Sequence, residues 1–240
     1  MALAARMQKK RWAVQPPNKK TADQLAGKLG VSNVLAQVLI NRKITDIDIA
    51  KSFLEPKLND LIPPEKMPGM SEAVARIKKA IENDEKITIY GDYDVDGITS
   101  VSICWQLLSM LGREPEYYVP HRVDEGYGLN EEAIKQIAAG GTDLIITVDC
   151  GISAIAEAKL AGSLGVDLII TDHHKVGSEL PDACAIVHPQ MNDYPNPASA
   201  GAMVAFKLAW AVINEFKSAE KAPPPLRQFL LDATTLAALG

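Results

Sequence analysis

Short apolar runs alternate with stretches of helical periodicity in the part of the chain that follows Lys86. The apolar runs, rich in Ile, Val and Tyr, are 86–91, 116–120, 143–149, 167–172 and 184–189. The helical stretches are 100–111, 130–139, 154–163, 200–216 and 226–239. Because buried parallel strands are nearly unbroken apolar runs joined by crossover helices, this alternation predicts an α/β fold with a mostly parallel, doubly wound sheet.

The first part of the chain shows helical patterns only. Residues 1–19 contain the polar stretch "VQPPNKK" and are predicted to be a weakly ordered tail. Residues 20–84 are predicted to be a helical region, with a capping box at Thr21 and Gln24 and a second helix start at "TDID". In its last helix, Val74, Ile77 and Ile81 fall on one face. Residues 85–240 then form the α/β domain.

Composition restricts the function classes. The chain has 240 residues, 47% of them hydrophobic and 23% charged, which is enough to bury a full core. It has no apolar run of bilayer length and no secretory signal at its start, so we expect a cytoplasmic protein without a membrane partner. The net charge of −5 gives no global signal for nucleic acid, although a local groove can be basic. The three cysteines, Cys104, Cys150 and Cys184, are predicted to be reduced.

The stretch "GDYDVDGITS" places Asp92, Asp94 and Asp96 on alternate positions, as at the start of a calcium-binding EF-hand loop. The bidentate glutamate of such a loop would stand at position twelve, which is Ile103 here, and a strand precedes the acids where an EF-hand has a helix. The stretch is therefore predicted to be an acidic turn between a buried strand and a helix that begins near Ile98.

Further acids and histidines follow the later strands. Asp149 ends the strand at 143–149, and Asp172, His173 and His174 end the strand at 167–172. Ligands of open α/β sheets bind at the carboxyl ends of the strands, so we expect these side chains to meet the acidic turn there. Taken singly, each Asp also fits a helix N-cap. Together, carboxylates with imidazoles and no thiolate favour two Mn²⁺ or Mg²⁺ ions and phosphoester hydrolysis.

Three short motifs carry a resemblance to a known family. "DYDVDG", "VDCG" and "DHH", in this order, resemble the first three motifs of the DHH phosphoesterase superfamily. Together with "HRVDEGYGLN", the form "GDYDVDG" resembles the RecJ single-strand-specific exonucleases, over about residues 40–240. The resemblance implies a DHH domain with two Mn²⁺ or Mg²⁺ ions that degrades single-stranded DNA from its 5′ end in repair and recombination. A single-strand-binding protein or a helicase is the partner that it implies.

The resemblance also implies roles for single residues. Asp94 and Asp96 would be metal ligands assisted by Asp92, Asp149 would bridge the two ions, and His173 would be a further ligand.

Other residues are expected to act around the ions or on the substrate. Asp172 would orient the site and His174 would contact the scissile phosphate. Arg122 is a candidate for a backbone phosphate contact, with a surface arginine as the alternative. Tyr127 fits stacking on a base or buried packing equally well. The N–H groups around Gly201 fit either a phosphate site or a close-packed helix start.

The chain departs from the family pattern in two places. His188 stands where the family tends to have asparagine before the proline. The family also continues past "LAALG" into a motif whose Asp completes the metal site and then into a second domain, and Asp232 does not match that Asp. We therefore expect an amino-terminal part of such a nuclease. The alternatives are a DHH phosphodiesterase for short oligonucleotides or cyclic dinucleotides, and a non-catalytic DNA-binding scaffold.

Overall fold

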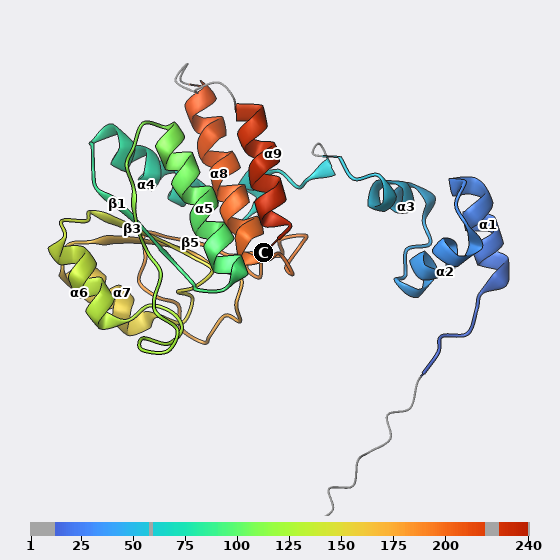
Figure 1. The fold of residues 1–240 in the computed structure, drawn as a ribbon, viewed down its shortest axis with the longest axis horizontal. Helices are drawn as coiled ribbons and strands as arrows, with labels where there is room; N and C mark the ends of the chain where they lie inside the picture. The colour runs from blue at the N-terminus through green and yellow to red at the C-terminus, as the bar shows by residue number, and fades with distance from the viewer. Residues whose placement is uncertain (1–12, 58–59, 219–225, 240) are drawn as a thin grey trace, which may run out of the picture. The chain divides into compact units, whose positions relative to one another are not determined.

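The computed structural model describes residues 13–57, 60–218 and 226–239 and divides the chain into two units (Figure 1). The first unit ends at Leu61 and the second begins at Ile62. The boundary at residue 84 that we expected from the sequence therefore falls inside the second unit. Among the described residues, no helix combines the length and apolar character needed to cross a membrane.

The first unit is helical in its described part. Its helices are α1 (Lys19–Leu29), α2 (Asn33–Asn41) and α3 (Ile47–Leu54). Their apolar faces share a small core formed by Ala22, Leu25, Ala26, Ala36, Leu39 and Ala50. Each helix starts after a polar side chain that accepts a hydrogen bond from the first turn: Asn18, Ser32 and Asp46. The capping box predicted at Thr21 is wrong, because Asn18 caps α1 three residues earlier.

The second unit is built on a parallel sheet, as the sequence predicts. Its strands are β1 (Ile87–Gly91), β2 (Glu116–Tyr118), β3 (Leu144–Val148), β4 (Asp167–Thr171) and β5 (Ala185–Val187). They lie in the order β2-β1-β3-β4-β5, and every neighbouring pair is parallel. The central strands β1 and β3 are buried along their whole length, which explains their unbroken apolar sequence.

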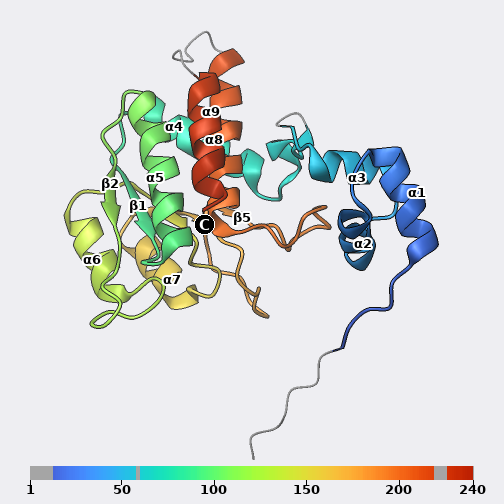
Figure 2. The same cartoon turned by 45° about the vertical axis from the view of Figure 1, so that its right-hand side comes forward.

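Helices cover both faces of this sheet (Figures 1 and 2). The helices α6 (Glu131–Ala139) and α7 (Ile155–Ser163) pack on one face. The other face carries α4 (Met70–Glu82), α5 (Val95–Met110) and α8 (Gly201–Ser218), with α9 (Leu226–Ala237) packed on α5 and α8. A short 3₁₀ turn, Pro64–Lys66, precedes α4. The arrangement is the predicted doubly wound α/β fold.

The packing of α4 differs from the sequence pattern. The buried face of this helix is made of Met70, Ala73, Ile77 and Ala80. Val74 and Ile81 are only partly buried. The buried face predicted from residues 74, 77 and 81 is therefore rotated about the helix axis relative to the face that the structure buries. Alanines let α4 lie close to α8 and β5, and this close contact decides which side is buried.

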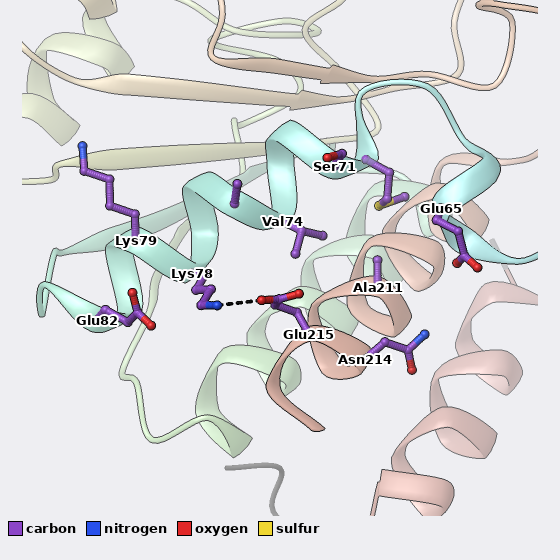
Figure 3. Close-up of a pocket in the computed structure, with 11 residues that line it drawn as sticks. Glu65, Ser71, Val74, Lys78, Lys79, Glu82, Ala211, Asn214 and Glu215 are labelled. Atoms are coloured by element: carbon purple, nitrogen blue, oxygen red, sulfur yellow. Dashed lines mark hydrogen bonds and ion pairs between the residues drawn. The ribbon is translucent and has the colours of Figure 1, made fainter. Parts of the chain in front are cut away.

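Polar groups lie where α8 meets its neighbours. A pocket of about 630 Å³ lies along the junction of α4 and α8, and at this pocket the Lys78 ammonium contacts the Glu215 carboxylate at 2.6 Å (Figure 3). None of the acids or histidines predicted for catalysis lines this pocket. Nearby, the ammonium of Lys207 is buried and donates a hydrogen bond to the carbonyl of Ile62. Burial lowers the pKa of Lys207 to about 8.

Candidate active site

The strands β1, β3, β4 and β5 end at the same level of the sheet. Their last residues, paired in register from strand to strand, are Gly91, Val148, Thr171 and Val187. The residues that follow directly are Asp92, Asp149, Asp172 and His188. Three acids and a histidine from segments far apart in sequence are therefore brought to one edge, which is the position where open α/β sheets bind ligands.

The first acidic turn lies between β1 and α5. The helix begins at Val95, three residues earlier than predicted, because the Asp94 carboxylate accepts a hydrogen bond from the N–H of Gly97 at 3.0 Å. Gly97 is required for this close turn, since a Cβ there would lie 2.4 Å from the Asp92 carbonyl oxygen. Asp92 points inward and is buried, whereas Asp94 is exposed.

The second turn, after β3, holds Asp149 in an uncommon backbone conformation. Its φ of 62° is left-handed, which Asp tolerates better than most residues and which occurs often at functional sites. The N–H of Asp149 donates to the Thr171 carbonyl at 2.9 Å. Gly151 follows with φ of 111°, and a Cβ there would lie 2.9 Å from the Thr147 hydroxyl. The turn therefore fixes the Asp149 side chain at the edge of the sheet.

The DHH turn after β4 is organised by Asp172. One carboxylate oxygen accepts hydrogen bonds from the N–H groups of His173 and His174 at 2.7 and 3.1 Å and lies 2.7 Å from Nδ1 of His174. The other accepts from the N–H of Ile152 at 2.9 Å. Asp172 is buried. Its carboxylate thus fixes the backbone and the imidazole of the turn, the geometry expected of an orienting residue.

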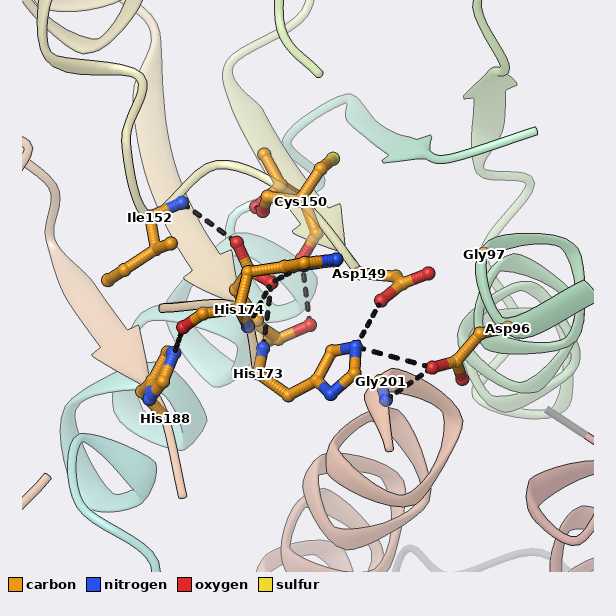
Figure 4. Close-up of polar contacts among 12 residues, drawn as sticks. Asp96, Gly97, Asp149, Cys150, Ile152, His173, His174, His188 and Gly201 are labelled. Atoms are coloured by element: carbon orange, nitrogen blue, oxygen red, sulfur yellow. Dashed lines mark hydrogen bonds and ion pairs between the residues drawn. The ribbon is translucent and has the colours of Figure 1, made fainter. Parts of the chain in front are cut away.

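His188 supports the same turn from below, a role that the sequence did not predict (Figure 4). Its Nδ1 accepts a hydrogen bond from the N–H of Gln190 at 3.1 Å, so its proton lies on Nε2, which donates to the His174 carbonyl at 2.8 Å. Burial lowers the pKa of His188, which keeps the ring neutral. Gln190 donates in turn to the His173 carbonyl at 2.9 Å. The signal for His188 was its place directly after a strand, like the acids.

Two overlapping groups of side chains have ligand atoms close enough together to hold metal ions. The first is Asp92, Asp94 and Asp149, and the second is Asp149, His173 and His174. Asp149 belongs to both groups, which is the arrangement that a bridging ligand requires. Within each group the ligand atoms lie within 4.8 Å of one another. One buried oxygen of Asp92 has no hydrogen-bond partner among the described residues, which is costly unless a cation occupies the site.

Asp96 lies beside these groups and contacts α8. Its carboxylate accepts hydrogen bonds from the N–H groups of Gly201 and Ala202 at 2.8 and 2.5 Å, so these N–H groups point at Asp96. Nε2 of His173 lies 3.1 Å from an Asp149 oxygen and 3.5 Å from an Asp96 oxygen (Figure 4). Gly201 also leaves space for Asp149, because a Cβ at Gly201 would lie 2.4 Å from Oδ1 of that side chain.

The electrostatics of the cluster favour a cation. Burial, with repulsion from Asp96 and Asp94, raises the pKa of Asp149 to about 6 against the lowering effect of His173. Burial likewise raises the pKa of Asp92. The hydrogen bond to Asp149 raises the pKa of His173, despite burial. Oxygen ligands with one or two imidazoles and no thiolate fit Mn²⁺ or Mg²⁺, so the residues present fit a site for such ions.

Arg122 and Tyr127 lie on the loop between β2 and α6. The guanidinium carbon of Arg122 is 5.2 Å from the ring centroid of Tyr93, which stands between Asp92 and Asp94. The Tyr127 hydroxyl is 3.0 Å from Nδ1 of His174 and 3.3 Å from the Asp149 carbonyl oxygen. The ring of Tyr127 is half-exposed, so it is not the fully buried packing residue of the alternative interpretation.

Cys150, next to Asp149, is not a nucleophile. Its side chain is buried, and burial with repulsion from Asp172 and Asp149 raises the pKa of the thiol well above its ordinary value. Cys104 is buried as well, and burial raises its pKa to about 12. All three cysteines are free, as predicted.

Fold and site together define an α/β domain with a cluster of acids and histidines that could hold metal ions, and comparison with known proteins identifies its family. The model of the DHH family, N-terminal domain, matches residues 86–238, and the chain belongs to this family.

Curated relatives include single-stranded-DNA-specific exonucleases RecJ. That of Bacillus subtilis (strain 168) is 47% identical over 209 residues, covering 86% of this chain and 27% of the relative. That of Thermus thermophilus is 36% identical over 190 residues, covering 79% of this chain and 26% of the relative. The chain thus spans about a quarter of the length of these two relatives.

Solved structures agree with these relatives. A structure of RecJ in complex with Mn²⁺ from Thermus thermophilus matches with a TM-score of 0.74 and 30% identity, covering 94% of this chain and 30% of that one. A structure of exonuclease RecJ bound to manganese matches with a TM-score of 0.63 and 36% identity, covering 72% of this chain and 42% of that one.

Proposed function

We propose that this chain carries the metal-binding catalytic site of an exonuclease that hydrolyses single-stranded DNA from its 5′ end. The observation that carries the proposal is the register of the sheet, which places Asp92, Asp149 and Asp172 at one edge with an unpartnered, buried carboxylate oxygen among them. The similarity to single-stranded-DNA-specific exonucleases supports the substrate class.

The ligand set follows from the two groups of side chains. In the proposal, Asp92 and Asp94 would hold one ion, His173 would hold the other, and Asp149, which belongs to both groups, would be a ligand shared by the two. Asp96 is retained as a proposed ligand. Each of its two carboxylate oxygens has two lone pairs, and the hydrogen bonds from Gly201 and Ala202 use only one lone pair on each oxygen, which leaves the other for an ion. Mn²⁺ and Mg²⁺ are both compatible with this set, and Mn²⁺ is bound in the similar solved structures.

The residues around the ions position the substrate and the water. Divalent ions, when bound, stabilise negative charge on phosphate oxygens and activate water for attack at phosphorus. Asp172 holds the His174 ring by its contact with Nδ1, and Nε2 of His174, which lies 3.4 Å from the Tyr127 hydroxyl, is the atom proposed to contact the scissile phosphate. Arg122 supplies a bidentate donor for a further phosphate, and the half-exposed ring of Tyr127 offers a stacking surface for a base.

The cellular setting is part of the proposal. A nuclease that acts on single-stranded DNA in repair and recombination would work in the cytoplasm and would meet strands opened by a helicase or covered by a single-strand-binding protein. The absence of a membrane-spanning helix in the described residues is compatible with this setting.

The test is nucleotide release from single-stranded DNA labelled at its 5′ end. The chain is assayed with Mn²⁺, with EDTA, and as the Asp149→Asn variant, with Asp232→Asn on α9 as a control of equal charge change outside the acidic cluster. We expect Mn²⁺-dependent release that Asp149→Asn abolishes and Asp232→Asn retains. Release unchanged by Asp149→Asn would refute the site. Faster turnover of dinucleotides than of long strands would favour a phosphodiesterase for short substrates.

A further inference from the structure

The loop of residues 119–130 contacts two of the three motifs of the site. Through Arg122 it contacts Tyr93 in the first acidic turn, and through Tyr127 it contacts His174 in the DHH turn. Gly126 and Gly128, on either side of Tyr127, both have left-handed φ angles, 81° and 86°. The chain therefore changes direction on both sides of Tyr127, and the loop has no helix or strand of its own to fix these bends.

The carboxylate of Glu125 closes this loop. One oxygen accepts a hydrogen bond from the N–H of His121 at 2.7 Å, and the N–H of Glu125 donates back to the His121 carbonyl at 2.9 Å. The other oxygen accepts hydrogen bonds from the Tyr118 hydroxyl and from the Asn130 side chain. A single side chain thus joins the strand before the loop, the start of the loop and the helix after it.

The donors to Glu125 are themselves fixed to the sheet. The Tyr118 ring stacks on Tyr90 of β1, with ring centroids 5.2 Å apart and planes inclined by 22°. The Tyr90 hydroxyl donates to the Gly128 carbonyl at 2.9 Å and accepts from the Asn130 side chain at 3.3 Å. Asn130 also caps α6, since its Oδ1 accepts from the N–H of Ala133 at 2.8 Å. These contacts fix the position of the loop relative to β1 and α6.

The charge of Glu125 suits this role. Three donors and no acceptor face its carboxylate, so the side chain is required as a pure acceptor. The hydrogen bond from the His121 N–H is the main reason that the pKa of Glu125 is lowered, which keeps it ionised at neutral pH. A glutamine would place an NH₂ group opposite at least one of these donors.

We propose that Glu125 is a positioning residue of the substrate site, which holds the 119–130 loop so that Arg122 and Tyr127 lie beside the first and third motifs. The inference rests on the proposed function, because Arg122 and Tyr127 serve there as substrate contacts. Glu125 itself is not a ligand of either metal group and acts only through the loop.

The test compares Glu125→Gln with Asp124→Asn. Asp124 is the neighbouring acid of the same loop, but its exposed carboxylate contacts only the imidazole of His121, at 2.7 Å, among the contacts described for it. Both variants remove one negative charge, so they differ in the hydrogen bonds lost. Tyr118→Phe is a third variant, which removes one donor to Glu125 and keeps the ring that stacks on Tyr90.

Hydrogen–deuterium exchange of the loop is the first measurement, because it needs no activity. We expect the backbone N–H groups of residues 119 and 121–127 to exchange about tenfold faster in Glu125→Gln than in the wild type, with Tyr118→Phe in between and Asp124→Asn unchanged. Equal exchange in Glu125→Gln and Asp124→Asn would overturn the inference.

The second measurement separates substrate binding from chemistry. We expect Glu125→Gln to raise the KM for a single strand about tenfold. With bis(4-nitrophenyl) phosphate and Mn²⁺, a substrate that lacks the further phosphate and the base proposed to contact Arg122 and Tyr127, kcat should fall far less. An unchanged KM, or equal losses for both substrates, would overturn the positioning role. A wild-type chain that neither binds nor cleaves the strand would instead refute the proposed function, and with it the substrate contacts of this loop.

Discussion

Replacing Gly201 by alanine tests how closely α8 packs on the acid that the proposal places between two ions. A Cβ at this position would lie 2.4 Å from Oδ1, 2.7 Å from Cγ and 2.8 Å from Cβ of Asp149. Carbon and oxygen atoms do not approach this closely without a covalent bond, so α8 or Asp149 must move. Asp149 is buried and contacts His173, so its side chain has little room to yield.

The magnitude follows from two opposing effects. Overpacking a buried position costs about 1–3 kcal/mol, whereas exchanging glycine for alanine in a helix gains up to about 1 kcal/mol. We therefore expect Gly201→Ala to lower the free energy of unfolding by about 1–2 kcal/mol. Losing a residue that merely supports a metal ligand lowers metal affinity by about 10- to 100-fold. Because the displaced side chain is here the proposed shared ligand itself, Mn²⁺ affinity should fall by at least about tenfold.

The assay is urea unfolding together with calorimetric titration of Mn²⁺, with Gly162→Ala as the control. Gly162 lies in α7, and a Cβ there would meet no atom of the described residues within 4 Å, so alanine should stabilise the protein by up to about 1 kcal/mol and leave Mn²⁺ binding unchanged. The two variants thus have opposite expected signs. Equal stability and equal Mn²⁺ affinity in both would refute the close packing of α8 on Asp149.

Two further predictions concern buried polar side chains. The pKa of Lys207 in the fold, about 8, lies below its ordinary value of 10.5. The buried ammonium therefore destabilises the folded protein fully below pH 8 and no longer does so above pH 10.5. Urea unfolding should show the wild type gaining about 3 kcal/mol relative to Lys207→Met between these pH values, and a constant difference would contradict the burial of the charge. His188→Ala leaves the His174 carbonyl without its donor and creates a cavity, so urea unfolding at pH 8 should show a free energy of unfolding lower by about 2–4 kcal/mol. A decrease of less than about 0.5 kcal/mol would contradict the support that His188 gives to the DHH turn.

The sheet and its acidic edge were predictable because both depend on local sequence. A short run rich in β-branched residues such as 144–148 favours a strand buried on both faces, and the acid that follows such a strand lies at its carboxyl end. Parallel pairing then brings Asp92, Asp149 and Asp172 together without further information. The resemblance to DHH phosphoesterases rests on these same turns and was confirmed by the family match.

The features that the sequence did not reveal depend on contacts between distant segments. Asp96 meets the first N–H groups of α8, more than a hundred residues away, and no local pattern encodes this pairing. His188 looks like a turn residue until β5 places it under the DHH turn. The buried face of α4 was misjudged because apolar spacing favours large residues, whereas close packing against α8 selected Ala73 and Ala80.

The central claim is that acids and a histidine from three separate strand ends form one site for two divalent ions. Calorimetric titration of the metal-free chain with Mn²⁺, read together with the electron paramagnetic resonance spectrum of the bound ions, tests it most directly. We predict two Mn²⁺ per chain with a spin-coupled spectrum, and at most one, uncoupled, in Asp149→Asn, because this side chain is shared by both groups of ligands. No Mn²⁺ binding by the wild type, or the same two coupled ions in Asp149→Asn, would contradict the claim.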